Sequence, residues 1–252
     1  MLNILIPMAG ESSFFSPSNG VTHPKAFYEV KGKPIIELAL EYLNKIEIKK
    51  RFIFVINEND SLKYKLDNVL KMLTNKDSKV VIQKAKTRGA VCSALLALNY
   101  IGKKDQLLIS NYDQILSHDI NKIIYFFNNK NIDGGVVCFQ SVHPHWSYAE
   151  IINNDKLIHV EEKKPISKNA IAGLYYFSKG EDFIECSKKI IMNSRSYSGN
   201  FYISTTFNEM VLKNKKLKVY KINPNEYHSF YSIKKLKEFE KSKNVPNDYY
   251  SY

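Results

Sequence analysis

The loop after the first apolar run has residue types that suit phosphate binding. Five residues of this kind follow the run at 3–7: Met8, Ala9, Gly10, Ser12 and Ser13. Backbone N–H groups between a strand and a helix can hold phosphate oxygens, and small side chains let such a group approach closely. A glycine-containing turn without catalytic meaning would look the same, so this loop alone does not decide between the two interpretations.

A second polar group lies where the segment VIQKAKTRGAVCSALLAL passes from an apolar run to a helical pattern. The Gln83 amide offers a hydrogen-bond donor and an acceptor, which can pair with the edge of a pyrimidine base. Gly89 begins the helix and would let a base or ribose approach the backbone closely. Arg88 is either a cation for the substrate phosphates or an exposed surface residue.

The order of the elements explains why these loops should meet. Strand-like runs alternate with helix-like segments in the first half: strands at 3–7, 52–56, 79–82 and 106–110, helices at 34–45, 61–73, 89–101 and 117–129. This alternation predicts an α/β fold with a three-layer, mostly parallel twisted sheet and helices on both faces. Ligands of such sheets bind beyond the carboxyl ends of the strands. The loop after 3–7, the segment 83–90 and the turn 110–113 should therefore line one crevice.

The second half has a different pattern. Strand-like segments joined by short turns come first, and mixed elements follow: strands at 134–142, 147–152, 156–162 and 172–177, helices at 180–192 and 203–214, a strand at 217–222 and a helix at 232–242. We expect these strands to form a small antiparallel sheet. No Pro/Gly/Ser-rich linker separates the halves, so we predict a single domain over 1–243, with halves at 1–130 and 131–243. The tail at 244–252 is expected to be disordered.

The charge and the cysteines limit the partners. The net charge of +12 comes mostly from lysines spread over the chain, which is typical of a solvated surface but also suits an anionic partner such as a nucleotide. Without a dense basic block or a known binding motif, we expect no nucleic acid partner. No apolar run approaches the roughly 18 residues of a membrane span, so we expect no membrane partner. The three cysteines are far apart, which favours free thiols and a cytoplasmic location.

The segment ILIPMAGESSFFSPSNGVTHPKAFYEVKGKPII resembles the N-terminal signature of the sugar-phosphate nucleotidyltransferases. That signature is an apolar strand followed by A-G-x-G-[ST]-R and then by P-K-P. Two positions differ, because Ser12 replaces the second glycine and Phe14 replaces the arginine. In the family this arginine is credited with gripping the nucleotide phosphates. The resemblance implies a GT-A-like nucleotidyltransferase fold, a nucleotide-binding first half and an acceptor-binding second half.

The resemblance also implies a metal site. Asp113, in LLISNYDQIL, matches the aspartate of the family that binds Mg²⁺, and a hard cation of this kind prefers oxygen ligands. Turn chemistry alone would also explain an aspartate here. Asn111 would order the turn or touch the acceptor. Lys25 matches the lysine of P-K-P and would contact phosphate, and Asn208 is the candidate for a second metal ligand unless it simply faces solvent.

For the acceptor, the segment HVEEKKPIS resembles the E-E-K-P signature of the family. The match implies that Glu162 and either Lys163 or Lys164 contact the acceptor and its phosphate. Gly173, in the strand NAIAGLYYF, would allow close approach. Tyr148, in HPHWSYAEI, is expected to shape the acceptor pocket or to pack a hairpin.

The sequence is thus identified as a divergent member of the family. The implied reaction is Mg²⁺-dependent coupling of an NTP to a phosphorylated acceptor, with release of pyrophosphate, for capsule or surface-glycan biosynthesis. The acceptor would be a sugar 1-phosphate or a small alcohol or amino-acid phosphate. A catalytically silent nucleotide or nucleotide-sugar binder with a regulatory or assembly role is the alternative. A glycosyltransferase of the same fold is disfavoured, because Asn111 removes the Asp-x-Asp metal motif. A homodimer remains open.

Overall fold

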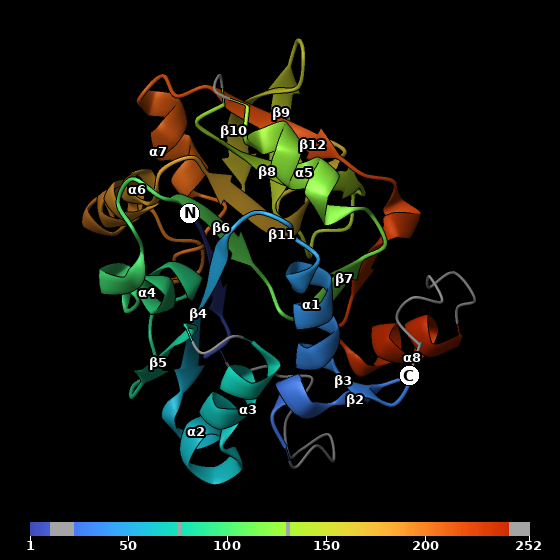
Figure 1. The fold of residues 1–252 in the computed structure, drawn as a ribbon. Coiled ribbons are helices and arrows are strands. Elements are labelled where there is room, and N and C mark those ends of the chain that lie inside the picture. Colours follow the sequence, from blue (N-terminus) through green and yellow to red (C-terminus); the bar gives the residue numbers. More distant parts are fainter. Residues whose placement is uncertain (11–22, 75–76, 130–131, 242–252) are drawn as a thin grey trace.

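The structure, a computed structural model, describes residues 1–10, 23–74, 77–129 and 132–241 (Figure 1). Three residues named above, Ser12, Ser13 and Phe14, lie outside these ranges. The tail predicted at 244–252 lies outside them as well. All structural statements below therefore concern the described residues.

A mixed sheet of nine strands forms the centre of the molecule, in the order β5-β4-β1-β6-β11-β8-β12-β10-β9. The strands of the first half are parallel to one another: β1 (Leu2–Pro7), β4 (Lys50–Asn57), β5 (Lys79–Gln83) and β6 (Gln106–Ser110). The prediction of an α/β fold with a parallel sheet is confirmed for this half.

The strands of the second half continue the same sheet: β8 (Gly134–Gln140), β9 (Tyr148–Ile152), β10 (Lys156–Glu161), β11 (Asn169–Phe177) and β12 (Leu217–Lys221). β11 runs antiparallel to both β6 and β8, whereas β12 is parallel to β8. The separate antiparallel sheet expected from the sequence is therefore wrong. By pairing with β6, β11 covers an edge that the parallel half would otherwise expose.

Two small sheets flank the main one. β2 (Glu29–Val30) pairs with β3 (Lys33–Pro34), and β7 (Gln114–Leu116) pairs with β13 (Tyr227–Ser229). The second pairing joins the turn after β6 to the last part of the described chain, so residues far apart in sequence meet beside the site described below.

Helices cover both faces of the main sheet (Figure 1). One face carries α1 (Ile35–Asn44), α3 (Leu66–Leu73) and α5 (Ile120–Phe127), and the other carries α4 (Ala90–Leu95), α6 (Gly180–Met192) and α7 (Thr206–Leu212). Successive side chains of a strand point to opposite faces, and accordingly Ile4 belongs to one apolar cluster and Leu5 to the other. A last helix, α8 (Ile233–Lys241), packs beside β13. No described helix has the length and apolar character needed to cross a membrane.

Two predicted helices are shorter than expected. In place of one helix at 61–73, the chain forms α2 (Glu58–Tyr64) and α3, because Lys65 between them adopts a left-handed conformation with φ of 54°. The α2 helix begins early because the Asn57 side chain accepts a hydrogen bond from the backbone N–H of Asp60. The segment 89–101 forms α4 and then a separate 3-10 turn at Leu98–Tyr100.

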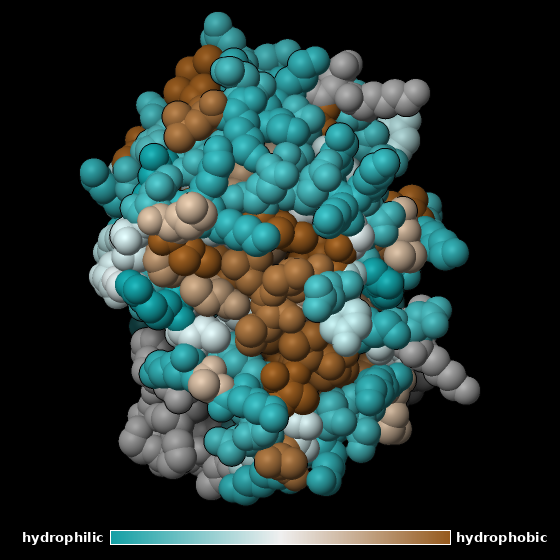
Figure 2. All heavy atoms as spheres, turned by 90° about the vertical axis from the view of Figure 1, so that its left-hand side faces the viewer, coloured by the Kyte–Doolittle hydropathy of each residue, from teal (hydrophilic) through white to brown (hydrophobic). Residues whose placement is uncertain are grey.

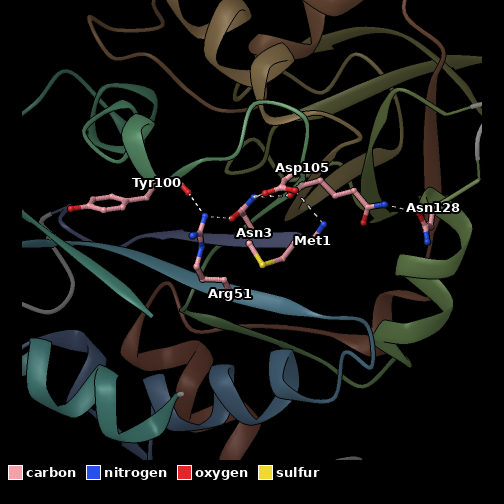
Figure 3. A network of polar contacts seen from close by, with 7 residues as sticks. Met1, Asn3, Arg51, Tyr100, Asp105 and Asn128 are labelled. Carbon is pink, nitrogen blue, oxygen red and sulfur yellow. Dashed lines mark hydrogen bonds and ion pairs between the residues drawn. The ribbon is translucent and has the colours of Figure 1, made fainter. Parts of the chain in front are cut away.

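A network of hydrogen bonds joins the amino ends of β1 and β4 to the residue before β6 (Figure 3). Arg51 Nη2 donates to Asn3 Oδ1 at 2.7 Å and to the carbonyl oxygen of Tyr100 at 2.5 Å. Asn3 Nδ2 in turn donates to Asp105 Oδ2 at 3.5 Å. This network lies at the end of the sheet opposite the carboxyl ends of the parallel strands, which leaves those carboxyl ends available for ligands.

Candidate active site

A cleft of about 610 Å³ opens at the carboxyl ends of β1, β4 and β5. Its walls come from the loops that follow these strands and from one segment of the second half: Pro7, Ala9 and Gly10; Asn57, Glu58, Asn59 and Asp60; Gln83 through Thr87, Gly89, Ala90 and Ser93; Asn200 and Tyr202. The prediction that the first loop and the segment 83–90 share a crevice is confirmed. The turn at 110–113 is not among the lining residues.

Gln83 carries an unsatisfied hydrogen-bond acceptor in the wall of this cleft. It is the last residue of β5, and its side chain is buried. Its Oε1 atom has no hydrogen-bond partner among the described residues. A buried acceptor without a partner costs about 1–3 kcal/mol. A ligand that donates a hydrogen bond to Gln83 would remove this cost.

Gly89 allows the segment 83–90 to pack closely against the segment 200–202, and both segments line the cleft. Its φ is +97°, and an added Cβ would lie 2.5 Å from the carbonyl oxygen of Phe201. The backbone of Phe201 donates to Arg88 O at 2.8 Å and accepts from Val91 N at 3.2 Å. Gly89 therefore serves the close approach of the chain's own backbone, which brings Tyr202 to the cleft. Sequence reasoning missed Tyr202, because its position depends on a backbone contact between Gly89 and Phe201, which are far apart in the sequence.

The cations of this loop are divided between two surfaces. Arg88 Nε donates to the carbonyl oxygen of Gly199 at 3.0 Å, and its guanidinium carbon lies 5.1 Å from the centre of the Phe201 ring. Arg88 does not line the cleft, whereas Lys84 and Lys86 do. Of the three cations in this loop, Lys84 and Lys86 thus face the cleft, and Arg88 holds the segment 199–201.

The first loop contributes backbone more than side chains. Met8 is buried and its N–H donates to Val55 O at 2.9 Å, so this residue belongs to the core. Ala9 and Gly10 line the cleft. Among the described residues, no atom lies within 4 Å of the place where a Cβ of Gly10 would stand. The described part of the chain therefore leaves this side of Gly10 uncovered.

Lys25 and Asp113 form an ion pair beside the cleft. The distance from Lys25 Nζ to Asp113 Oδ2 is 2.5 Å, and the two side chains are 8% and 26% exposed. The backbone carbonyl of Asp113 accepts a hydrogen bond from Phe230 N at 2.8 Å. Burial raises the pKa of the neighbouring Tyr112 phenol, and the charges of Asp113 and of Asp60 raise it further. Because Asp60 lines the cleft, the Tyr112 phenol lies within electrostatic reach of a cleft residue and of the ion pair.

The donor set at Asp113 fits a magnesium ion that is shared with a substrate. No group of three or more His, Cys, Asp or Glu residues suited to a metal occurs among the described residues. Asp113 would thus supply a single carboxylate, and Mg²⁺ is commonly held by one or two carboxylates together with waters and substrate phosphates. Asn208 does not have a free amide, because its Oδ1 accepts from Val160 N and its Nδ2 donates to Val160 O, both at 2.8 Å. Its amide ties α7 to β10.

Gly173 accommodates two side chains of the protein itself. Its φ is +61°, and an added Cβ would lie 2.5 Å from both Asn111 Nδ2 and Gln114 Oε1. The backbone N–H of Asn111 also donates to Gly173 O at 3.1 Å. Gln114, which sequence reasoning missed, is buried, and its Nε2 has no partner among the described residues. The close approach predicted at Gly173 is therefore made by the turn that carries Asp113.

Glu162 is a buried carboxylate held by two serines. Its Oε2 accepts hydrogen bonds from Ser204 Oγ at 2.9 Å and from Ser147 Oγ. Burial raises the pKa of Glu162, and the two serines and Lys163 act in the opposite direction. Lys164 is exposed. Of the two candidate lysines, it is thus Lys163 that lies beside the buried carboxylate.

Lys163 and His145 link the acceptor half to the ion pair. Lys163 Nζ donates to the hydroxyl of Tyr202 at 3.3 Å. The imidazole of His145 stacks on Tyr231 with 4.2 Å between ring centres. Burial lowers the pKa of His145, the charges of Lys163 and Lys25 lower it further, and Asp113 opposes them. His145 therefore lies within electrostatic reach of all three charged groups.

Tyr148 lies deeper than expected. Its side chain is fully buried in the core, and its hydroxyl donates to the carbonyl oxygen of His143 at 2.7 Å. This placement corresponds to the second alternative for Tyr148, the packing of a hairpin, because β9 and β10 are antiparallel neighbours.

Comparisons with known proteins identify the same fold. Residues 9–226 match a family model described as Nucleotidyl transferase. A nucleoside-diphosphate-sugar pyrophosphorylase from Vibrio cholerae RC9 is similar in structure, with a TM-score of 0.81 and 23% identity over 95% of this chain and 100% of that chain. The inositol-1-phosphate CTP transferase from T. maritima has a TM-score of 0.72 and 14% identity, over 96% of both chains. No curated protein matches the sequence.

Proposed function

Since the chain belongs to the nucleotidyl transferase family, we propose that it transfers a nucleotidyl group from an NTP to a phosphorylated small-molecule acceptor and releases pyrophosphate. The observation that supports this reaction most directly is the cleft of about 610 Å³. It has an unsatisfied amide oxygen at Gln83 for a base and two lysines in the same loop for phosphates. The Lys25–Asp113 pair lies at its side.

In this proposal the protein contributes position and charge. The donor groups of a base would satisfy Gln83, and the open backbone at Ala9 and Gly10 would lie against phosphate oxygens. An oxygen of the acceptor phosphate attacks the α-phosphorus of the NTP, the bond to the bridging oxygen breaks, and pyrophosphate leaves with that electron pair. Lys25 and the cleft lysines would offset the negative charge of the reacting phosphates, so that the two anions can approach in line. Asp113 would hold Mg²⁺, which supplies further neutralisation of phosphate charge when bound.

The acceptor would lie on the side of Lys163. This lysine is fixed by the Tyr202 hydroxyl, and Tyr202 is itself part of the cleft wall. A phosphate held by Lys163 would therefore be placed next to the nucleotide. The acceptor could be a sugar 1-phosphate or the phosphate of a small alcohol or amino acid, and the NDP-linked product would serve capsule or surface-glycan assembly in the cytoplasm.

One observation favours a second function, a catalytically silent nucleotide binder. The family's loop arginine is replaced by Phe14, and no arginine occurs among the residues found to line the cleft. Arg88, the nearest arginine in sequence to the cleft loop, is engaged with Gly199 and Phe201. Lysines provide charge but not the two-pronged contact that a guanidinium makes with phosphate, so binding could persist where catalysis is lost.

A pyrophosphate-release assay separates the two functions. The purified chain is mixed with Mg²⁺, each NTP in turn and a panel of sugar, amino-alcohol and amino-acid phosphates. At least one pair should release pyrophosphate, and Asp113→Asn should reduce this release by at least about 100-fold. Nucleotide binding by calorimetry without release in any pair would establish the silent binder. A chain that neither binds nor turns over any NTP would contradict both.

A further inference from the structure

The lining of the cleft carries charges of both signs. Glu58 and Asp60 come from the start of α2, and Lys84 and Lys86 come from the loop after β5. The neighbouring surface differs, since no charged residue occurs from 89 to 102 and Figure 2 shows a broad apolar area at the level of α4. Lysines can offset the charge of a triphosphate, whereas a carboxylate repels phosphate unless a cation lies between them. The two carboxylates are therefore better suited to contact the base or the ribose.

Asp60 is fixed to the strand residue that neighbours Gln83. Asn57, the last residue of β4, pairs directly with Gln83, the last residue of β5. Neighbouring strands lie about 4.8 Å apart, and paired residues point to the same face of the sheet. Asn57 Nδ2 donates to Asp60 Oδ2 at 2.5 Å, and Asn57 Oδ1 accepts from the backbone N–H of Asp60 at 2.8 Å. These two bonds hold the Asp60 carboxylate on the side of the cleft to which Gln83 belongs.

Both groups lack hydrogen-bond donors. Gln83 is 6% exposed, and its Oε1 acceptor has no partner among the described residues. Burial raises the pKa of the Asp60 carboxyl, the hydrogen bond from Asn57 acts in the opposite direction, and no cation of the described chain contributes. A ligand with N–H donors would satisfy both the amide oxygen and the carboxylate. The unpaired oxygen of Gln83 and the carboxylate of Asp60 thus point independently to a donor on the ligand.

We propose that the cleft selects nucleotides whose base carries an exocyclic amino group, and that Asp60 is the residue that sets this preference. The inference rests on the proposed function, because it concerns the base of the NTP. One hydrogen of the amino group would be donated to Gln83 Oε1 and the other to the Asp60 carboxylate. Cytosine, adenine and guanine each have such a group.

Uracil and thymine would be disfavoured at the same place. They carry a carbonyl oxygen where cytosine carries its amino group. The Gln83 amide can turn over and offer its N–H groups to this oxygen, but an ionised carboxylate can only accept. The carbonyl oxygen and the Asp60 carboxylate would therefore meet without a hydrogen between them, and such unpaired polar groups reject the wrong ligand strongly. Glu58, in the same lining, adds negative charge with the same effect.

Calorimetric titration of the full chain with NTPs and Mg²⁺, without an acceptor, tests the proposal. The pairs CTP and UTP, ATP and ITP, and GTP and ITP compare a base that carries the amino group with one that lacks it. The nucleotide that binds most tightly should be CTP, ATP or GTP. Its counterpart without the amino group should bind at least about tenfold more weakly, because a hydrogen bond to a charged group is lost.

The variant Asp60→Asn tests the assigned residue. A carboxamide can accept from an amino group or donate to a carbonyl oxygen. The affinity for the amino-bearing nucleotide should therefore fall, and the affinity for its counterpart should rise. The bonds to Asn57 are retained, since a carboxamide oxygen still accepts. The matched control is Asp67→Asn at the start of α3, whose carboxylate accepts from Ser61 Oγ at 3.0 Å outside the cleft lining. It should leave both affinities unchanged.

Three other outcomes would overturn the proposal. Tightest binding of UTP or dTTP, or equal affinities within each pair, would do so and would leave the proposed function intact. An Asp60→Asn variant that binds every nucleotide more weakly by the same factor would assign the carboxylate to the ribose or to a metal ion. A chain that binds none of the NTPs would contradict the proposed function itself, and the inference with it.

Discussion

At the scale of single residues, the most informative group is the amide of Gln83, because it is buried without a partner at the cleft wall. Replacement by methionine keeps the volume and removes the unsatisfied oxygen. We expect Gln83→Met to keep or raise the melting temperature and to weaken NTP binding by about 10- to 100-fold. Calorimetry and thermal denaturation measure the two effects.

A matched control for this prediction is Ser187→Ala. Ser187 is also buried and also has an unpaired oxygen, but it lies on α6 away from the cleft lining. The control should leave NTP affinity unchanged. Equal affinities of wild type and Gln83→Met would show that the amide does not contact the nucleotide.

Glu162 gives a prediction about pH. Burial raises the pKa of this carboxyl in the folded protein, so as pH rises the unfolded chain ionises first, near its usual pKa of about 4.3. Folding stability is therefore lost as pH rises from the unfolded pKa through the raised folded pKa, and it stays reduced above that. Glu162→Gln does not titrate and still accepts from the serines. Its melting temperature minus that of the wild type should increase between about pH 4 and pH 7.

The exposed Glu150 provides the comparison for this experiment. Glu150→Gln should leave the difference from the wild type flat over the same pH range. A difference for Glu162→Gln that stays constant or shrinks as pH rises would contradict the assigned direction of the pKa shift.

At the scale of elements, the contact between Gly89 and Phe201 decides the shape of the cleft. A Cβ at position 89 would meet the backbone of Phe201 at 2.5 and 2.7 Å, at a φ of +97°. Gly89→Ala should thus cost about 2–4 kcal/mol of unfolding free energy. It should also weaken NTP binding, because Tyr202 would move with the displaced segment. Gly10→Ala, whose added Cβ meets no described atom within 4 Å, should retain wild-type stability in denaturant titration.

The elements differ in how well the sequence predicts them. The strands β1, β4 and β6 were predictable because strands covered on both faces are continuously apolar. The break at Lys65 was not, since its left-handed φ of 54° has no signal in a lysine. The joining of β11 to β6 depends on a ladder between residues more than sixty positions apart, such as Leu174 and Ser110, and local pattern does not encode such pairing.

The site was predictable to a similar degree. Gln83 and Gly10 could be placed at the cleft because they lie at or just after the carboxyl ends of strands. Tyr202 could not, since its position depends on the backbone contact at Gly89. Arg88 shows the limit of inference from neighbours in sequence, because its guanidinium lies on Phe201 although Lys84 and Lys86 of the same loop line the cleft.

At the scale of the whole molecule, the net charge of +12 should draw anionic substrates toward the cleft. Salt shortens the range of this attraction, from about 10 Å at 0.1 M to about 3 Å at 1 M. NTP affinity should therefore fall on the order of tenfold between about 50 and 500 mM NaCl, mainly through slower association. Stopped-flow binding measures the rates. Binding of the uncharged nucleoside should not depend on salt, and an NTP association rate that does not depend on salt would contradict the prediction.

In the unliganded protein, the ammonium group of Lys25 neutralises the charge of the Asp113 carboxylate. A free divalent cation would have to displace an ammonium group that is already in contact with the carboxylate. Lys25 can leave more easily when a triphosphate arrives with its own cation, because the phosphate oxygens then accept the ammonium. The metal would in this way bind together with the nucleotide, and the unliganded protein would not hold it. Chelators should accordingly stop turnover without lowering the melting temperature of the unliganded protein.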